Sequence, residues 1–125
     1  MLSNQDINVL GNIVNTSWGK SGDSNGRSVS AMLQGDILTF RFSTIVHFAA
    51  ENALKVQVDR LAAESIDILA GKLKTLKAQF KESTGNTLKV KEVSNRDNLE
   101  LISRTSNSPR KIAYYRRNLS VSVDS

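Results

Sequence analysis

Residues 51–83 read ENALKVQVDRLAAESIDILAGKLKTLKAQFKES. Apolar side chains recur in this stretch at steps of three or four, at Leu54, Val58, Leu61, Leu69, Leu73, Leu76 and Phe80, with Ser65 as the one polar member of the series. This spacing is typical of a helix with one buried face. Acidic residues come early and lysines late, as the helix dipole favours. Gly85 follows where a helix is expected to stop, so the sequence predicts one helix about 50 Å long.

The first turns of this stretch allow a second interpretation. Residues 54–58 read LKVQV and alternate as a short strand does, in which case the helix would begin near Asp59. We favour the long helix because the apolar stripe and the charge gradient both continue through residues 54–58.

Two further elements are expected before the long helix. Ser3 is in position to cap a short N-terminal helix whose apolar side chains are Ile7, Leu10, Val14 and Trp18 and which ends near Ser17. Residues 28–34 and 38–48 alternate as strands, and Gly35-Asp36 between them suits a two-residue hairpin. Three of the four phenylalanines fall on one face of the second strand, which predicts that this face lies in the core.

The C-terminal part of the chain reads as three more strands. Residues 88–91 alternate, a bulge is expected near Glu92, and residues 95–98 (NRDN) read as a turn before a short strand at 99–102. After a loop at 105–109, the last strand covers about 111–123. Arg117 falls on its apolar face, so we expect its stem to lie along the sheet and its head to reach solvent.

These elements define a single α+β domain over residues 1–125. One mainly antiparallel sheet of about five strands is packed on one face by the short N-terminal helix and the long central helix. The chain contains no cysteine and no apolar run long enough to span a membrane, and its N-terminus lacks the features of a secretion signal. We therefore expect an intracellular or virion setting.

Residues suited to catalysis are scarce. His47 is the only histidine, it lies in a predicted strand, and no thiol is present. Metal binding would depend on carboxylates alone, and we predict neither a cofactor nor a small-molecule substrate. The sequence favours a non-enzymatic protein.

Positive charge is concentrated in the second half of the chain. Residues 1–70 carry five Lys and Arg against seven Asp and Glu, whereas residues 71–125 carry twelve against five. The candidate surface for an acidic or protein partner consists of Lys74, Lys77, Lys81, Arg104, Arg110, Lys111, Tyr114, Arg116 and Arg117. Guanidinium groups interleaved with tyrosines suit single-stranded nucleic acid, but they are also enriched at protein interfaces. Adjacent Tyr114 and Tyr115 point to opposite faces of a strand, so at most one belongs to an exposed platform.

Residues 18–28 read as a flexible or assembly loop of about ten residues. Three glycines and several small polar residues make its ordering costly. We expect a neighbouring chain to order it, with Trp18 anchoring its near end to the core. The candidate assembly residues are Trp18, Gly19, Lys20, Ser21, Gly22 and Asp23.

The order helix, hairpin, helix, strands, at this length and without cysteine, resembles the small ring-forming proteins of tailed phages, such as tail terminators and head–tail connector subunits. The resemblance implies a symmetric homo-oligomer, in a virion or in the host cytoplasm, whose sheet edges and loops make the contacts between subunits and with other structural proteins. A small basic protein that binds nucleic acid is the second hypothesis.

Overall fold

The computed structural model describes residues 1–18, 21–22, 27–104 and 111–125. Its elements in chain order are α1 (Asn4–Trp18), β1 (Ser21–Gly22), β2 (Ser28–Gln34), β3 (Ile37–Phe48), α2 (Glu51–Thr84), β4 (Lys89–Arg104) and β5 (Lys111–Asp124). The domain is α+β, as predicted: two helices pack on one antiparallel sheet. The sheet order is β1-β2-β3-β5-β4, and β1 contributes only two residues to it.

Helix α2 is the long helix that the apolar stripe predicts, and it is helical from Glu51 onward. The alternative of a strand at residues 54–58 is therefore wrong. Gly85 adopts the left-handed conformation (φ 76°), and its N–H donates to the Lys81 carbonyl, which ends the helix where expected. Ser65 is fully buried, and its hydroxyl donates to the Ala62 carbonyl at 2.7 Å, so the polar break in the stripe is satisfied within the helix.

The N-terminal helix and the first hairpin also follow the sequence pattern. The Ser3 hydroxyl accepts from the Asp6 N–H at 3.0 Å and caps α1. Gln34 pairs with Ile37 around the two-residue turn, in which Gly35 has φ 60°.

The strand prediction fails at residues 95–98. These residues form no turn; they lie inside the 16-residue strand β4, which pairs with β5 along its length. The expected bulge near Glu92 is confirmed as a register shift between Glu92 and Ser94, and a second shift lies between Leu101 and Ser103. Two of the predicted strands are thus one strand.

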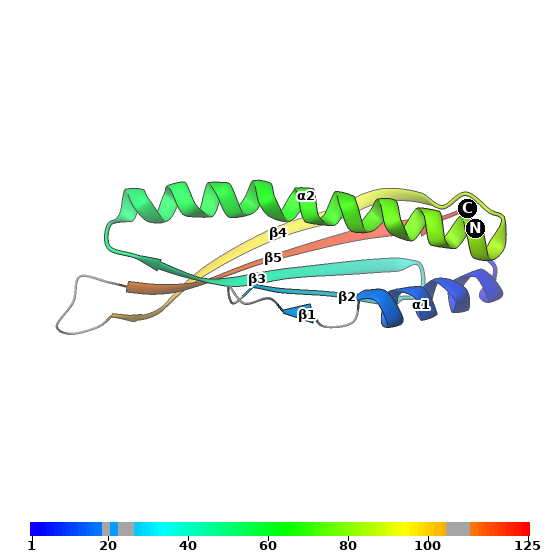
Figure 1. Cartoon of the computed structure of the whole chain (residues 1–125), viewed down its shortest axis with the longest axis horizontal. Coiled ribbons are helices and arrows are strands. Elements are labelled where there is room, and N and C mark those ends of the chain that lie inside the picture. The colour runs from blue at the N-terminus through cyan, green and yellow to red at the C-terminus, as the bar shows by residue number, and fades with distance from the viewer. Residues whose placement is uncertain (19–20, 23–26, 105–110) are drawn as a thin grey trace.

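Both helices cover the same face of the sheet, which we call the inner face; the opposite face is the open face. Figure 1 shows α2 running along the whole sheet, whereas α1 covers only the end where the two termini lie. The main cluster of buried side chains joins both helices to β3 and β5 through Leu10, Val14, Leu38, Phe40, Leu69, Leu76, Phe80, Leu119 and Val121. A second cluster consists of Phe42, Val46, Leu61 and Tyr115. The phenylalanine face of β3 is therefore in the core, as predicted.

Candidate interaction surfaces

The open face of the sheet is mostly polar, although Met32 and Ile45 also project from it, and cross-strand hydrogen bonds join its polar side chains. Thr39 and Ser120 share a hydrogen bond at 3.1 Å, and the Arg41 Nε donates to Asn118 Oδ1 at 3.3 Å. Neither helix covers this face, so its side chains are available to a partner.

Tyr114 and Arg116 form the aromatic and cationic part of the open face. The Arg116 guanidinium carbon lies 5.2 Å from the centre of the Tyr114 ring, within cation–π range. Tyr114 also hydrogen-bonds to Ser43 on β3, and this bond, followed by the charge of Arg116, lowers the pKa of the phenol below its ordinary value of 10.0. Tyr115 points inward and is fully buried. The expectation that the two adjacent tyrosines point to opposite faces of the strand is confirmed.

The two tyrosines should titrate separately. Burial, followed by the nearby Asp97 carboxylate, raises the pKa of Tyr115 above 10.0, whereas that of Tyr114 is lowered. Ultraviolet absorbance of the folded protein should show two steps on either side of pH 10, and Ser43→Ala should move the lower step upward. The pKa of Tyr115 is higher in the folded state than in the unfolded state. The protonated phenol therefore makes its full contribution to the free energy of unfolding below pH 10, and this contribution is lost as the pH rises through the folded pKa. A single step at pH 10 that Ser43→Ala leaves unmoved would contradict this assignment.

Arg117 lies on the inner face and is engaged there by three partners. Its Nε is 3.0 Å from Asn95 Oδ1 and 3.3 Å from Asp97 Oδ1, and its Nη1 donates to the Ala62 carbonyl of α2 at 3.2 Å. Asp97 also accepts from the Tyr115 hydroxyl at 3.4 Å. The Arg117 side chain is only 13% exposed. The expectation that its head reaches solvent is therefore wrong, because α2 and β4 both present oxygen acceptors to it.

Strand β4 forms one edge of the sheet. It pairs with β5 on one side, and among the described residues nothing pairs with its other side. Residues 91–102 are all exposed. Four of the nine exposed large hydrophobic side chains in the described part of the chain belong to this strand: Val93, Leu99, Leu101 and Ile102, each between 42% and 58% exposed. Sequence reasoning missed this edge, because it divided the strand at residues 95–98.

The predicted basic set does not gather into one surface. Tyr114 and Arg116 lie on the open face, while Arg117 lies on the inner face and is occupied. Lys74, Lys77 and Lys81 are exposed on the C-terminal half of α2, which packs on the inner face. Lys111 forms an ion pair with Glu51, with 3.3 Å between Nζ and Oε1. The backbone of Arg104 pairs with Lys111 in the sheet, and Arg110 lies outside the described residues.

The predicted assembly loop is partly anchored within its own chain. Ser21 and Gly22 pair with Val29 and Ser28, so the expectation of an unstructured loop across 18–28 is wrong at these two positions. Arg27 forms an ion pair with Glu64 on α2. Trp18 is the last residue of α1. Gly19, Lys20 and Asp23 lie outside the described residues, and the prediction that a neighbouring chain orders the loop stays a prediction.

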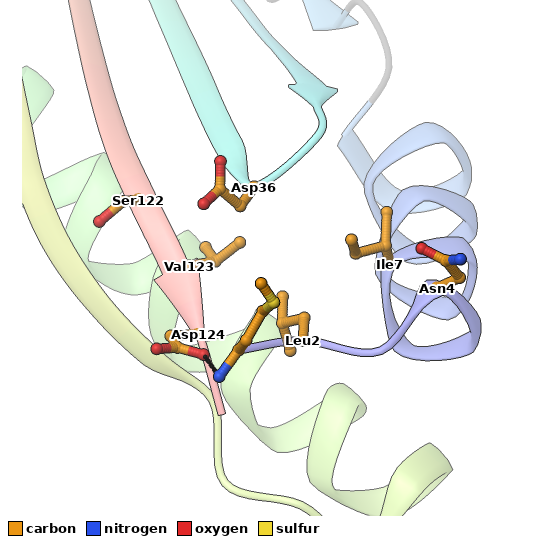
Figure 2. A pocket seen from close by; sticks show the side chains of 8 residues that line it. Leu2, Asn4, Ile7, Asp36, Ser122, Val123 and Asp124 are labelled. Atoms are coloured by element: carbon orange, nitrogen blue, oxygen red, sulfur yellow. Dashed lines mark ion pairs between the residues drawn. The ribbon is translucent and has the colours of Figure 1, made fainter.

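A pocket of about 390 Å³ opens at the end of the domain that holds both termini. Figure 2 shows that α1, the β2–β3 turn and the end of β5 surround it. The terminal amine of Met1 lies 2.6 Å from Asp124 Oδ1, and this hydrogen bond is the main cause that lowers the pKa of Asp124. Among the described residues that line the pocket, Asp36 is the only other one with an ionisable side chain. The two carboxylates of the lining are therefore those of Asp36 and Asp124, and the latter is held by the terminal amine.

Comparisons with known proteins identify no relative: no protein-family model matches the chain, and neither the curated proteins nor the solved structures give a significant match.

Among the helices of the described ranges, none is both long enough and apolar enough to cross a membrane. Helix α2 has the length, but lysines and carboxylates are distributed along its exposed side.

Proposed function

We propose that this protein is a non-enzymatic structural subunit that assembles with copies of itself. The observation that carries the proposal is the β4 edge: a 16-residue strand, unpaired along one side within the described residues, with half-exposed Leu and Ile side chains. Sheet edges in monomeric proteins are usually short or covered, because unpaired N–H and C=O groups invite pairing with another chain. A long edge with apolar side chains is the geometry of a surface that another strand completes.

The setting we propose is the one that the sequence resemblance implies, a phage particle or its assembly in the host cytoplasm. Other structural proteins of the particle would then be further partners. The order of the elements along the chain supports this setting.

Nucleic-acid binding is supported less well. Single-stranded nucleic acid would need a basic groove lined by aromatic side chains. On the open face the described side chains include Tyr114, Arg41, Arg96 and Arg116. Arg41 already bonds Asn118, Glu100 adds a negative charge to the same face, and the α2 lysines lie on another part of the molecule.

Sedimentation velocity over a range of protein concentrations tests the proposal. The chain mass is 13.7 kDa, and we expect species at multiples of that mass whose population grows with concentration. A protein that stays at 13.7 kDa at every concentration would contradict self-assembly. If such a monomer bound a single-stranded oligonucleotide with an affinity that falls steeply with salt, the nucleic-acid hypothesis would replace the present one.

A further inference from the structure

Between its two register shifts, β4 carries two charged side chains, Arg96 and Glu100, that have no partner among the described residues. The register places Arg96 opposite Asn118 and Glu100 opposite Tyr114, so both project from the open face. The side chain of neither residue forms a hydrogen bond or an ion pair with another described residue. They cannot meet each other, because residues four apart on a strand are separated by about 13 Å. Both charges are therefore available to a second strand on the side of β4 that no described strand pairs with.

The two bulges limit the length over which β4 can be paired. The register shifts at Glu92/Ser94 and Leu101/Ser103 bend the strand and interrupt its ladder. The regular stretch between them includes residues 95–101, about 23 Å long. Bulges at both ends of an exposed edge restrict pairing to this central stretch and oppose slippage into longer ladders.

We propose that residues 95–101 of β4 pair antiparallel with the same residues of a second copy, around a two-fold axis at Asn98. The inference rests on the proposed function, since it specifies the contact through which copies assemble. In this register Arg96 of each chain lies opposite Glu100 of the other, which gives two cross-strand ion pairs. The contact is isologous, so its smallest product is a dimer with one continuous sheet.

Charge selects this register over its neighbours. A continuous sheet needs the open faces of the two copies on the same side. Because side chains alternate between faces, the two-fold axis must then pass through a residue and not between two residues. Centring on Arg96, Asp97 or Glu100 places that charge directly opposite its own copy, which is destabilising. Centring on Leu99 places Arg96 opposite the bulged Ile102 and Glu100 opposite Asn98, so that no opposite charges lie directly across from each other. Of the positions from 96 to 100, only an axis at Asn98 places opposite charges directly across from each other and has an uncharged residue at its centre.

The inner face of the same stretch is compatible with this contact. Asp97 is already bonded to Arg117 and Tyr115 within its own chain, so it needs no partner across the interface. Leu99 and Leu101 project from the inner face and are 42% and 48% exposed. In the proposed register Leu99 lies diagonally across the axis from Leu99 of the second copy, close enough for contact. Pairing therefore covers apolar surface while it joins the charges.

Charge reversal provides the first experiment, measured by sedimentation velocity. Arg96→Glu and Glu100→Arg each convert two attractive pairs into two repulsive ones, and either variant should raise the dimer dissociation constant roughly 10- to 100-fold. The double variant restores opposite charges and should recover the dimer. An equimolar mixture of the two single variants should form a mixed dimer, because each supplies the charge that the other lacks. Arg60→Glu, an equal charge change at an exposed site on α2, should leave the mass distribution unchanged.

A disulfide tests the axis itself. The chain has no cysteine, so Asn98→Cys introduces one thiol that faces its own copy at about 4.5–5.5 Å between Cα atoms, within disulfide range. Mild oxidation should yield a covalent dimer of twice 13.7 kDa. Ser94→Cys is the control: position 94 would lie opposite position 102 of the second copy, which places the two thiols about 26 Å apart, and it should remain uncross-linked.

The outcomes separate this inference from the proposed function. Oligomers whose mass does not respond to either reversal, or that cross-link through Ser94→Cys as readily as through Asn98→Cys, would overturn the register while leaving self-assembly through another surface. A wild-type protein that is monomeric at all concentrations would overturn both. Loss of the dimer in the single variants with recovery in their mixture supports both.

Discussion

Replacing Phe80 with alanine should lower the free energy of unfolding by about 3–5 kcal/mol. The ring is fully buried in the cluster that joins α1, α2 and the sheet. Its removal takes a large apolar side chain out of the core and leaves a cavity that the surrounding helices can fill only in part. Urea unfolding followed by circular dichroism measures the change, with an unaltered slope showing that the unfolded state is the same.

Val56→Ala is the matched control for this substitution. Val56 is an apolar residue on the same helix but is 67% exposed, so its truncation should change stability by less than about 0.5 kcal/mol. Wild type and variants should be compared at one protein concentration, because assembly adds to apparent stability by mass action. A loss below about 1 kcal/mol for Phe80→Ala would mean that the C-terminal half of α2 is not packed as described.

The elements that sequence reasoning predicts correctly are those with a long local signal. In α2 an apolar residue or Ser65 returns every third or fourth position over about seven turns, and Gly85 supplies the stop. The hairpin at Gly35-Asp36 has its own turn chemistry. Such patterns lie within one element and need no knowledge of the rest of the chain.

The turn expected at residues 95–98 fails for a physical reason. Asn and Asp favour turns because their side chains hydrogen-bond the nearby backbone. In β4 the same residues are engaged across the sheet instead: Asn95 and Asp97 accept from Arg117 on β5. Pairing with a strand distant in sequence outweighs local preference, and strand propensity depends strongly on such context. The sequence has no local signal for that pairing.

For the candidate surface, the sequence predicts which residue types are present but not where the folded domain places them. A run of two tyrosines and two arginines at 114–117 indicates a surface rich in binding groups, and strand alternation divides it between two faces. Which face the helices cover depends on the packing of the whole domain. The edge position of β4 likewise follows from the insertion of β5 between β3 and β4, which the order of elements along the chain does not reveal.

Arg116 and Arg117 test directly whether strand alternation places one arginine on the open face and the other on the inner face, because they are adjacent residues with the same side chain. Arg117→Met should destabilise the protein by about 1.5–3 kcal/mol, the range for hydrogen bonds to charged groups. The substitution removes the donor to the Ala62 carbonyl and leaves Asp97, 49% exposed, without its cation. Methionine retains most of the stem, so loss of packing contributes little.

Arg116→Met makes the same change of charge on the open face. It removes the cation–π contact with Tyr114, which at a solvent-accessible site contributes about 0.5–1 kcal/mol. Urea unfolding of both variants at one protein concentration should therefore give a larger loss for Arg117→Met, and the difference should persist in high salt because the Arg117 bonds are shielded by α2 and β4. Equal losses, or a loss for Arg117→Met that high salt abolishes, would show that the Arg117 head is solvated and that α2 does not close over it.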